Sequence, residues 1–262
     1  MQIKTRLIPL LLAACSLGAL PVSAAPGDII FRNVKTTILV DLLPTPAAPA
    51  SASGSAKIKV RQVNATQTAT LRLTLDGFTP GKYRVFATLQ DASIVAIGGF
   101  KITAAGLPAE PGKDDGTILR TIPAAVDATK IASLAVKDAN STTILEGDTV
   151  VDSVSVNYVA NVRITGPTPN IFPGLGVHGH AVAHSKSLNG VETRRVFIWN
   201  AFGAPPATVL TINVNGAAVG TISSTNQGQV FFSNLDASVD LTKINIVTLT
   251  DGSNAVIMQA QF

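Results

Sequence analysis

Hydrophobic and polar residues alternate along much of this 262-residue chain. The clearest stretches are 57–61 and 71–75, in which Ile58 and Val60, then Leu71, Leu73 and Leu75, are separated by polar residues. In 83–87, Tyr83, Val85 and Ala87 oppose Arg84 and Phe86. A period of two is typical of half-buried antiparallel strands. Apolar residues at helical spacing are nearly absent beyond the first 25 positions. The pattern therefore predicts an all-β protein.

Turn residues divide these strands. Asn189-Gly190, Asn215-Gly216 and Asp251-Gly252 each lie between apolar-periodic runs, which predicts two-residue hairpins. The Pro/Ala/Ser-rich stretch from Pro44 to Ser55 has little to bury and predicts a loop or linker.

Part of the chain occurs twice. Ala124–Ile131 returns 113 positions later as Ala237–Ile244, and Ala96–Phe100 resembles Ala218–Ile222 at a separation of 122. A repeat at this distance indicates two copies of one fold. We expect two tandem antiparallel β-sandwich domains related by internal duplication, at residues 26–150 and 151–262, with a boundary near Val150–Asp152. Within each repeat, Asp127 or Asp240 would bind nearby backbone amides and hold a single turn.

The segment Asp76–Tyr83 resembles the loop-to-strand turn of transthyretin-like and immunoglobulin-like modules of secreted bacterial proteins, in which a Pro-Gly turn precedes a strand that opens with an aromatic residue. The match covers eight residues. It implies an Ig-like sandwich with a scaffold or adhesive role.

Residues 1–25 are typical of an export signal, because Lys4 and Arg6 precede the apolar run Leu7–Leu20 and the small-residue site Val22–Ala24. Leu12–Cys15 also resembles the lipobox of bacterial lipoproteins, in which Cys15 would carry lipid. We favour cleavage near Ala24 or Ala25. Cys15 is the only cysteine, so the mature chain is expected to hold no disulfide.

The net charge of the chain limits which classes of binding partner can be predicted. The formal charge is +4, and it falls to +2 once Lys4 and Arg6 are removed, which is too weak to predict binding to nucleic acid or an anionic membrane. No spanning segment is expected in the mature chain. The partner would be an unknown protein or cell-surface component.

All three histidines lie within seven residues: His178, His180 and His184. On a strand these side chains share one face, and His178 and His180 are close enough to bind one zinc or copper ion. The alternative is a solvated polar strand face. No cysteine or suitably spaced acid completes a metal site.

Other motifs fail on context. Gly174–Gly179 has the glycine spacing of a dinucleotide site, but prolines precede it and no helix follows. Gly106–Lys113 resembles a phosphate loop with one residue too many and Asp114 where Ser or Thr is required. Asp114-Asp115 and Asp148 with Asp152 supply too few oxygens for calcium.

No catalytic or cofactor set is predicted, and no cofactor is expected. The sequence favours a non-enzymatic structural, adhesive or protein-interaction module in the periplasm, on the cell surface or secreted. Two alternatives remain: a zinc or copper protein that uses His178 and His180, and a surface carbohydrate-binding module that uses Trp199, although Trp199 and Phe197 are more typical of a core.

Overall fold

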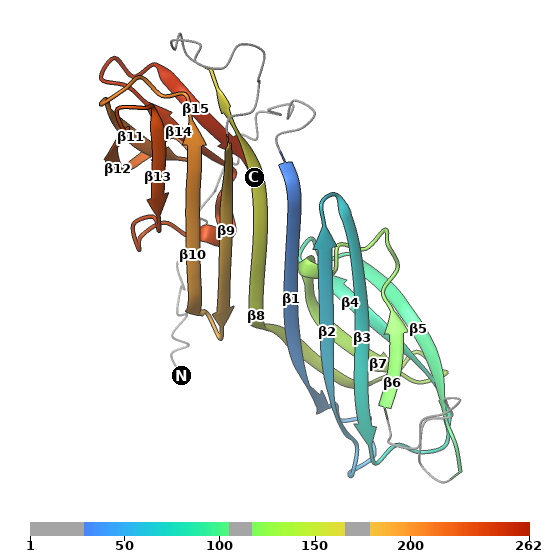
Figure 1. Ribbon diagram of the computed structural model, residues 1–262. Coiled ribbons are helices and arrows are strands. Elements are labelled where there is room, and N and C mark those ends of the chain that lie inside the picture. The colour runs from blue at the N-terminus through green and yellow to red at the C-terminus, as the bar shows by residue number, and fades with distance from the viewer. Residues whose placement is uncertain (1–28, 105–116, 166–178) are drawn as a thin grey trace, which may run out of the picture.

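The computed structural model describes residues 29–104, 117–165 and 179–262, and in these ranges the chain is all β (Figure 1). Every strand pair is antiparallel. Helical structure in these ranges is confined to two single 3₁₀ turns, and no helix there is long and apolar enough to span a bilayer. The elements are β1 (Ile29–Pro44), β2 (Ser53–Val63), β3 (Thr66–Asp76), β4 (Gly81–Leu89), β5 (Ile94–Ile102), β6 (Thr117–Thr121), η1 (Ala128–Lys130), β7 (Ile131–Lys137), β8 (Thr143–Ile164), β9 (Gly179–Leu188), β10 (Val191–Phe202), β11 (Val209–Val214), β12 (Ala217–Ser223), β13 (Gln229–Ser233), η2 (Leu241–Lys243), β14 (Ile246–Thr250) and β15 (Val256–Gln261).

One hydrogen-bonded sheet runs through the whole described structure. Its strand order is β6-β3-β2-β1-β8-β9-β10-β13, and we call it the front sheet (Figure 1). β8 is the central member, because residues 153–160 pair with β1 on one edge and with β9 on the other. The ends of β8 also pair with β7 and with β15, so this strand connects the front sheet to both groups of strands behind it.

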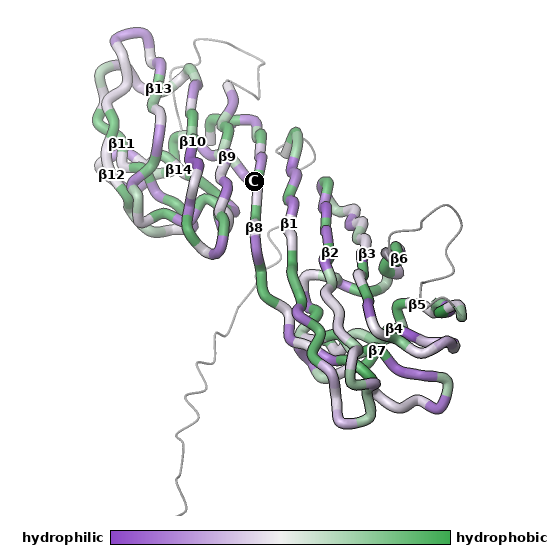
Figure 2. Tube along the Cα trace, turned by 90° about the horizontal axis from the view of Figure 1, so that it is seen from below, coloured by the Kyte–Doolittle hydropathy of each residue, from purple (hydrophilic) through white to green (hydrophobic). Residues whose placement is uncertain are grey.

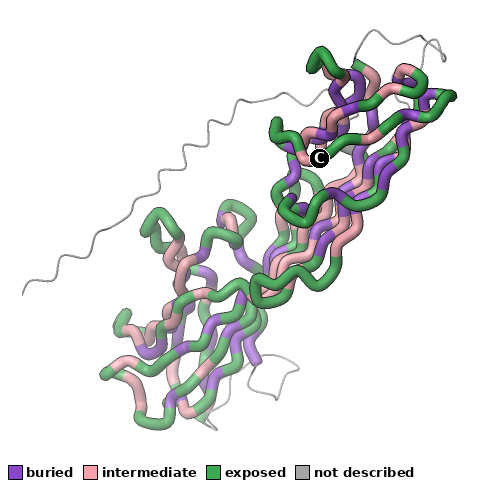
Figure 3. Tube along the Cα trace, turned by 90° about the vertical axis from the view of Figure 1, so that its left-hand side faces the viewer, coloured by how far each residue is buried: buried purple, intermediate pink, exposed green. Residues whose placement is uncertain are grey.

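Two apolar clusters lie behind the front sheet and define two lobes. In lobe 1 the strands β4, β5 and β7 cover a core that includes Ile58, Leu71 and Val85. In lobe 2 the strands β11, β12, β14 and β15 cover a core that includes Phe197 and Trp199. The buried segments form two separate groups in Figure 3.

Both cores contact the same face of the front sheet. Val34 packs against the lobe 2 core, and Ile38, four residues further along β1, belongs to the lobe 1 core. Residues an even number apart on a regular strand point to one side. The opposite face is therefore continuous and solvent-facing, and it carries Lys57, Lys59 and Arg61.

The predicted alternation is confirmed in lobe 1. Along β3 every second residue from Ala69 to Leu75 is buried, and the residues between them are exposed. Tyr83, Val85 and Ala87 of β4 are buried in the same way. Hydropathy changes residue by residue along these strands (Figure 2), which is the pattern that a sheet with one wet face requires.

The two repeated segments occupy matching places. In lobe 1 the β7–β8 hairpin pairs Ser133 with Asp148, and in lobe 2 the β14–β15 hairpin pairs Ile246 with Gln261, each residue displaced by 113 positions. Both hairpins also have a register shift at the corresponding step. The preceding 3₁₀ turns match as well, since Asp127 and Asp240 each accept a hydrogen bond from the backbone N–H two residues ahead.

The match extends to the other back strands. β4 pairs with β5 and β7, as β11 pairs with β12 and β14. The β4–β5 ladder has its irregularity at Ile97 and the β11–β12 ladder at Val219, which is the separation of 122 seen in the sequence. A conserved irregularity of this kind aligns the strands residue by residue.

A further equivalence has no counterpart in the sequence pattern. The backbone N–H of Thr45 donates to the carbonyl of Ile144, and that of Thr165 donates to Ile257. Their hydroxyls donate to Thr143 and Val256. The acceptors again differ by 113 positions, whereas the two threonines differ by 120. The second half of β8 therefore stands in lobe 2 where β1 stands in lobe 1.

Two of the three predicted two-residue turns are confirmed. Asn189-Gly190 and Asn215-Gly216 have positive φ at both residues and join β9 to β10 and β11 to β12. The prediction for Asp251-Gly252 is wrong, because this turn is longer and Asn254 is the residue with positive φ. The Asp251 carboxylate accepts N–H bonds from Ser253 and Ala255 and so holds a wider loop.

The chain passes between lobes within a strand. The expected boundary at residues 150–151 falls inside β8, whose first residues pair with β7 and whose last pair with β15. The loop predicted at 44–55 lies between β1 and β2, although Pro44 and Ser53–Ser55 belong to those strands. Ala48 and Ala52 of this loop pack on the lobe 1 core.

Candidate functional site

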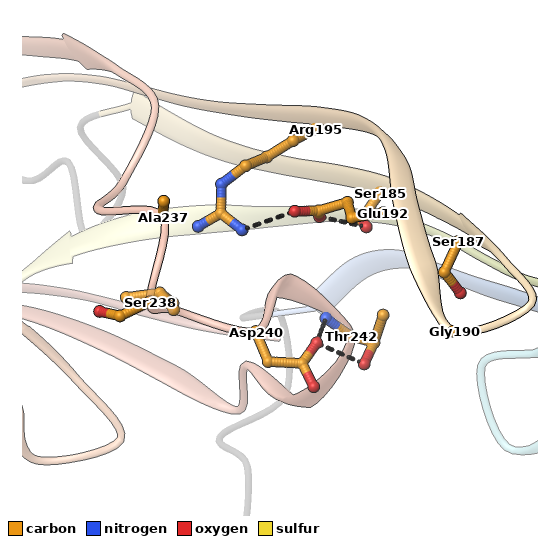
Figure 4. A pocket seen from close by; sticks show the side chains of 10 residues that line it. Ser185, Ser187, Gly190, Glu192, Arg195, Ala237, Ser238, Asp240 and Thr242 are labelled. Carbon is orange, nitrogen blue, oxygen red and sulfur yellow. Dashed lines mark hydrogen bonds and ion pairs between the residues drawn. The ribbon is translucent and has the colours of Figure 1, made fainter.

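A polar pocket of about 280 Å³ lies beside the β9–β10 hairpin of lobe 2 (Figure 4). One wall is formed by this hairpin and the other by the segment that leads into η2. The lining residues are Ser185, Ser187, Gly190, Glu192, Arg195, Ala237, Ser238, Val239, Asp240 and Thr242. A cavity of this size lies near the lower end of the range of about 300–1,000 Å³ that is typical of small-molecule sites, so it suits a small polar ligand rather than a large substrate.

Three side chains of the hairpin form a hydrogen-bonded row. The Ser185 hydroxyl donates to Glu192 Oε1 at 2.7 Å, and Arg195 Nη1 donates to Glu192 Oε2 at 3.2 Å. Arg195 Nη2 also donates to the Asp236 carbonyl at 2.6 Å and ties the two walls together. Arg195 Nε is buried without a hydrogen-bond partner in the described structure. It is the polar atom at this pocket whose bonding is incomplete.

The opposite wall presents an ionised carboxylate. Asp240 Oδ1 accepts from the Thr242 N–H at 2.9 Å and from the Thr242 hydroxyl at 2.6 Å. Burial raises the pKa of Asp240, but these hydrogen bonds and the nearby Lys243 ammonium outweigh it and hold the pKa below its usual value. Asp240 is therefore negative at neutral pH.

The equivalent hairpin of lobe 1, β2–β3, carries different residues at these positions. When the two hairpins are aligned on Asn64 and Asn189, Val60 is equivalent to Ser185, and Gln67 is equivalent to Glu192. The Gln67 amide donates to the Asp127 carboxylate at 3.2 Å and accepts from the Ala128 N–H at 3.0 Å, so it closes the space above η1. Glu192 turns instead to Ser185 and Arg195. The sequence did not single out these three residues, because they look like ordinary alternating strand positions.

The predicted metal-binding pair is His178 and His180, and His178 lies outside the described residues. His180 lies on β9 between Asn161 of β8 and Asn200 of β10, and His184 lies between Asn157 and Val196. Burial, reinforced by the charge of Arg194, lowers the pKa of His184 below its usual value. Within 29–104, 117–165 and 179–262, no three His, Cys, Asp or Glu side chains form a cluster that could hold a metal ion.

Trp199 and Phe197 belong to the lobe 2 core. Both are fully buried, and Trp199 stacks on Phe232 with ring centroids 5.8 Å apart. A ring in this position has no face open to a sugar. Asp148 and Asp152 lie on β8, where Asp148 pairs with Ser133 of β7 and the Asp152 carbonyl accepts the Asn189 N–H. Asp114-Asp115, Gly106–Lys113 and the glycines at 174 and 176 lie outside the described residues.

No family model matches this chain, and no curated protein or solved structure is significantly similar to it.

Proposed function

We propose that the protein is an exported, non-enzymatic interaction module built from two immunoglobulin-like β-sandwiches that arose by internal duplication. The hydrogen-bond equivalence of the lobes carries this proposal. Thr45 and Thr165 make the same two bonds to carbonyls 113 residues apart, and the ladders around them repeat register and irregularities. Sandwiches of this class serve widely as scaffolds whose binding residues vary on an unchanged framework.

The proposed role fits the chemistry of the lobe 2 pocket. Ser185 is 1% exposed and its hydroxyl proton is committed to Glu192, so it is poorly placed as a nucleophile for an incoming substrate. The charged side chains of Arg195, Glu192 and Asp240 instead place directional hydrogen-bonding groups around the pocket. Such a site recognises a polar group by complementarity.

A substrate screen tests the non-enzymatic part. The purified chain would be assayed on chromogenic esters, phosphomonoesters, glycosides and casein, alongside the variant Ser185→Val/Glu192→Gln, which carries the lobe 1 residues at these positions. We expect no turnover by either protein. Turnover by the native chain that the variant lacks would overturn the proposal, whereas equal turnover by both would require a second preparation to exclude a contaminant.

The exported part is tested at the amino terminus. Expression of the full chain in a bacterium and mass spectrometry of the mature protein should give a terminus near Ala24 or Ala25. A diacylated terminus at Cys15 would place the protein on a membrane surface by a lipid anchor. Retention of residues 1–25 in the cytoplasm would contradict export.

A further inference from the structure

Residues 26–150 of the sequence include thirteen Lys or Arg and eleven Asp or Glu, a formal charge of +2, whereas residues 151–262 include five of each kind. The net charges of the two lobes therefore differ little, and lobe 1 is distinguished by where its cations lie. Clustered cations on one surface favour association with an anionic partner.

Four of these cations lie together on the solvent face of the lobe 1 back strands. Lys82 of β4 lies directly opposite Lys101 of β5, and Arg84 of β4 lies directly opposite Lys137 of β7. We call these four residues the cationic quartet. Side chains opposite each other in a ladder are about 5 Å apart, and alternate residues of one strand about 7 Å. Like charges at this distance repel and destabilise the sheet.

The acids in the described part of lobe 1 form no ion pair with the quartet. Among the described residues, no ion pair joins any member of the quartet to a carboxylate. Glu146 and Asp148 face the same side, but they lie on β8 beyond β7. Asp138 is close by, and its carboxylate accepts the backbone N–H groups of Asn140 and Thr142.

The second lobe shows that the fold does not need these charges. At the same register positions, Lys82 opposite Lys101 becomes Val209 opposite Ser223. Arg84 opposite Lys137 becomes Thr211 opposite Thr250. The acid is retained, since Asp251 corresponds to Asp138 and accepts the equivalent N–H groups. Repulsion that one copy avoids and the other keeps indicates a requirement outside folding.

Three members of the quartet, Lys82, Arg84 and Lys101, line a surface hollow of about 690 Å³ that is large enough for two or three sugar rings. Its floor includes the half-buried ring of Phe86, with the Lys137 ammonium 5.3 Å from the ring centroid. Arg120 of β6 adds a fifth cation at the rim, where Nε donates to the Gly99 carbonyl at 3.1 Å. The hollow thus combines several cations with one apolar surface.

We propose that this hollow binds a linear anionic polysaccharide through carboxylate or sulfate groups, and the assignment rests on the proposed function as an interaction module. Cations about 5–7 Å apart match charges carried on successive sugars, and Phe86 provides an apolar contact for a ring face. Nucleic acid is less well matched, because single-stranded sites stack successive bases on several open aromatic rings. Of the rings that line the hollow, Tyr83 and Phe100 are buried, and Phe86 is half-buried.

The test compares two variants of the full chain with equal change in charge. The first, Lys82→Val/Arg84→Thr/Lys101→Ser/Lys137→Thr, carries the lobe 2 residues. The second, Lys35→Ser/Lys57→Thr/Lys59→Thr/Arg61→Thr, removes four cations from the front sheet. Fluorescein-labelled polygalacturonate and dextran sulfate, neutral dextran and a single-stranded DNA oligonucleotide serve as probes in anisotropy titrations at about 50 mM salt.

We expect the native chain to bind at least one anionic glycan and not neutral dextran. The first variant should lose at least tenfold in affinity, and the front-sheet variant should stay within about threefold, since the latter changes only the long-range field. Equal losses, a larger loss in the front-sheet variant, preference for DNA or absence of glycan binding would each overturn the site. Turnover of a bound glycan would instead contradict the non-enzymatic function and leave the site intact.

Discussion

Lys35 of β1 lies directly opposite Ser155 of β8, and the two residues occupy equivalent positions in the two lobes. The separation of 120 that relates Thr45 to Thr165 also relates Lys35 to Ser155. On either side of this pair the ladder is symmetric, since Val34 pairs with Val156 and Thr36 with Val154. The lobes therefore meet about a local two-fold axis through this pair, as two subunits of a symmetric dimer do.

The first prediction concerns this junction. Lys35→Pro places a residue without an N–H group in the middle of a sheet and should lower the free energy of unfolding by about 3 kcal/mol. Lys35→Thr is the control and should be nearly neutral. Urea unfolding is followed by the fluorescence of Trp199, the single tryptophan, which reports on lobe 2, and by circular dichroism, which reports on both lobes.

The two signals should coincide in the native chain, because the lobes share β8 and the β1–β8 ladder. They should separate in Lys35→Pro. Separate transitions in the native chain would show that the junction does not couple the lobes.

The second prediction concerns the matching 3₁₀ turns. Asp127→Ala and Asp240→Ala each remove a carboxylate that accepts the first free N–H of a turn, and each should cost about 0.5–2 kcal/mol at pH 7. Burial raises the pKa of Asp127, but hydrogen bonds from Thr129 and Gln67 outweigh it and lower the pKa overall. The pKa of Asp240 is lowered in the same way, by hydrogen bonds from Thr242 and by Lys243.

A lowered pKa fixes the direction of the pH dependence. The stabilisation is complete above the unfolded-state pKa of about 4 and is lost as the pH falls through the folded-state pKa. The destabilisation caused by either substitution should therefore shrink between about pH 5 and pH 2. Denaturant titrations across this range measure it, and a difference that is constant with pH would show that the carboxylate charge contributes nothing.

The third prediction concerns the quartet. Lys101→Ser should raise stability by about 0.2–1 kcal/mol at low salt, because it relieves the repulsion with Lys82. The gain should fall as salt rises and screens the charges. Thermal unfolding at about 20 mM and about 500 mM salt compares the two conditions. A decrease in stability at low salt would mean that the lysines are not in repulsive contact.

The fourth prediction concerns the corner where β1 meets β8. A Cβ at Gly147 would overlap the carbonyl of Asp41, so Gly147→Ala should cost about 1–3 kcal/mol. Gly220→Ala is the control, because nothing lies within 4 Å of its Cβ position. Chemical denaturation compares them, and similar values for both variants would contradict the close approach of the strands.

The fifth prediction addresses the histidines. Zinc and copper titrations of the full chain, followed by elemental analysis after desalting, should leave less than one equivalent of metal. A stoichiometric ion that disappears in His178→Ala/His180→Ala would establish the metal-binding alternative. His184→Ala serves as the control, because His184 lies four residues from His180 on β9.

Local pattern was enough to predict the alternating strands of lobe 1, a single turn at each repeat and two of the hairpin turns, because alternation at Leu71, Leu73 and Leu75 and capping by Asp127 depend on neighbouring residues. The pairing of β1 with β8 could not be predicted in this way, since Lys35 and Ser155 share no residue type and no motif marks their register. The cationic quartet and the lobe 2 pocket could not be predicted for the same reason, because both depend on strand register. Lys82 meets Lys101, and Ser185 meets Glu192, only once strands are aligned.

The length of β8 has a mechanical consequence. Its 22 residues, if fully extended, would reach roughly 70 Å, and they belong to both halves of the molecule. A flexible tether between two modules lets each one reorient, whereas an unbroken strand flanked by neighbours acts as a strut. A partner bound to lobe 1 is therefore held at a fixed distance and angle from a partner bound to lobe 2.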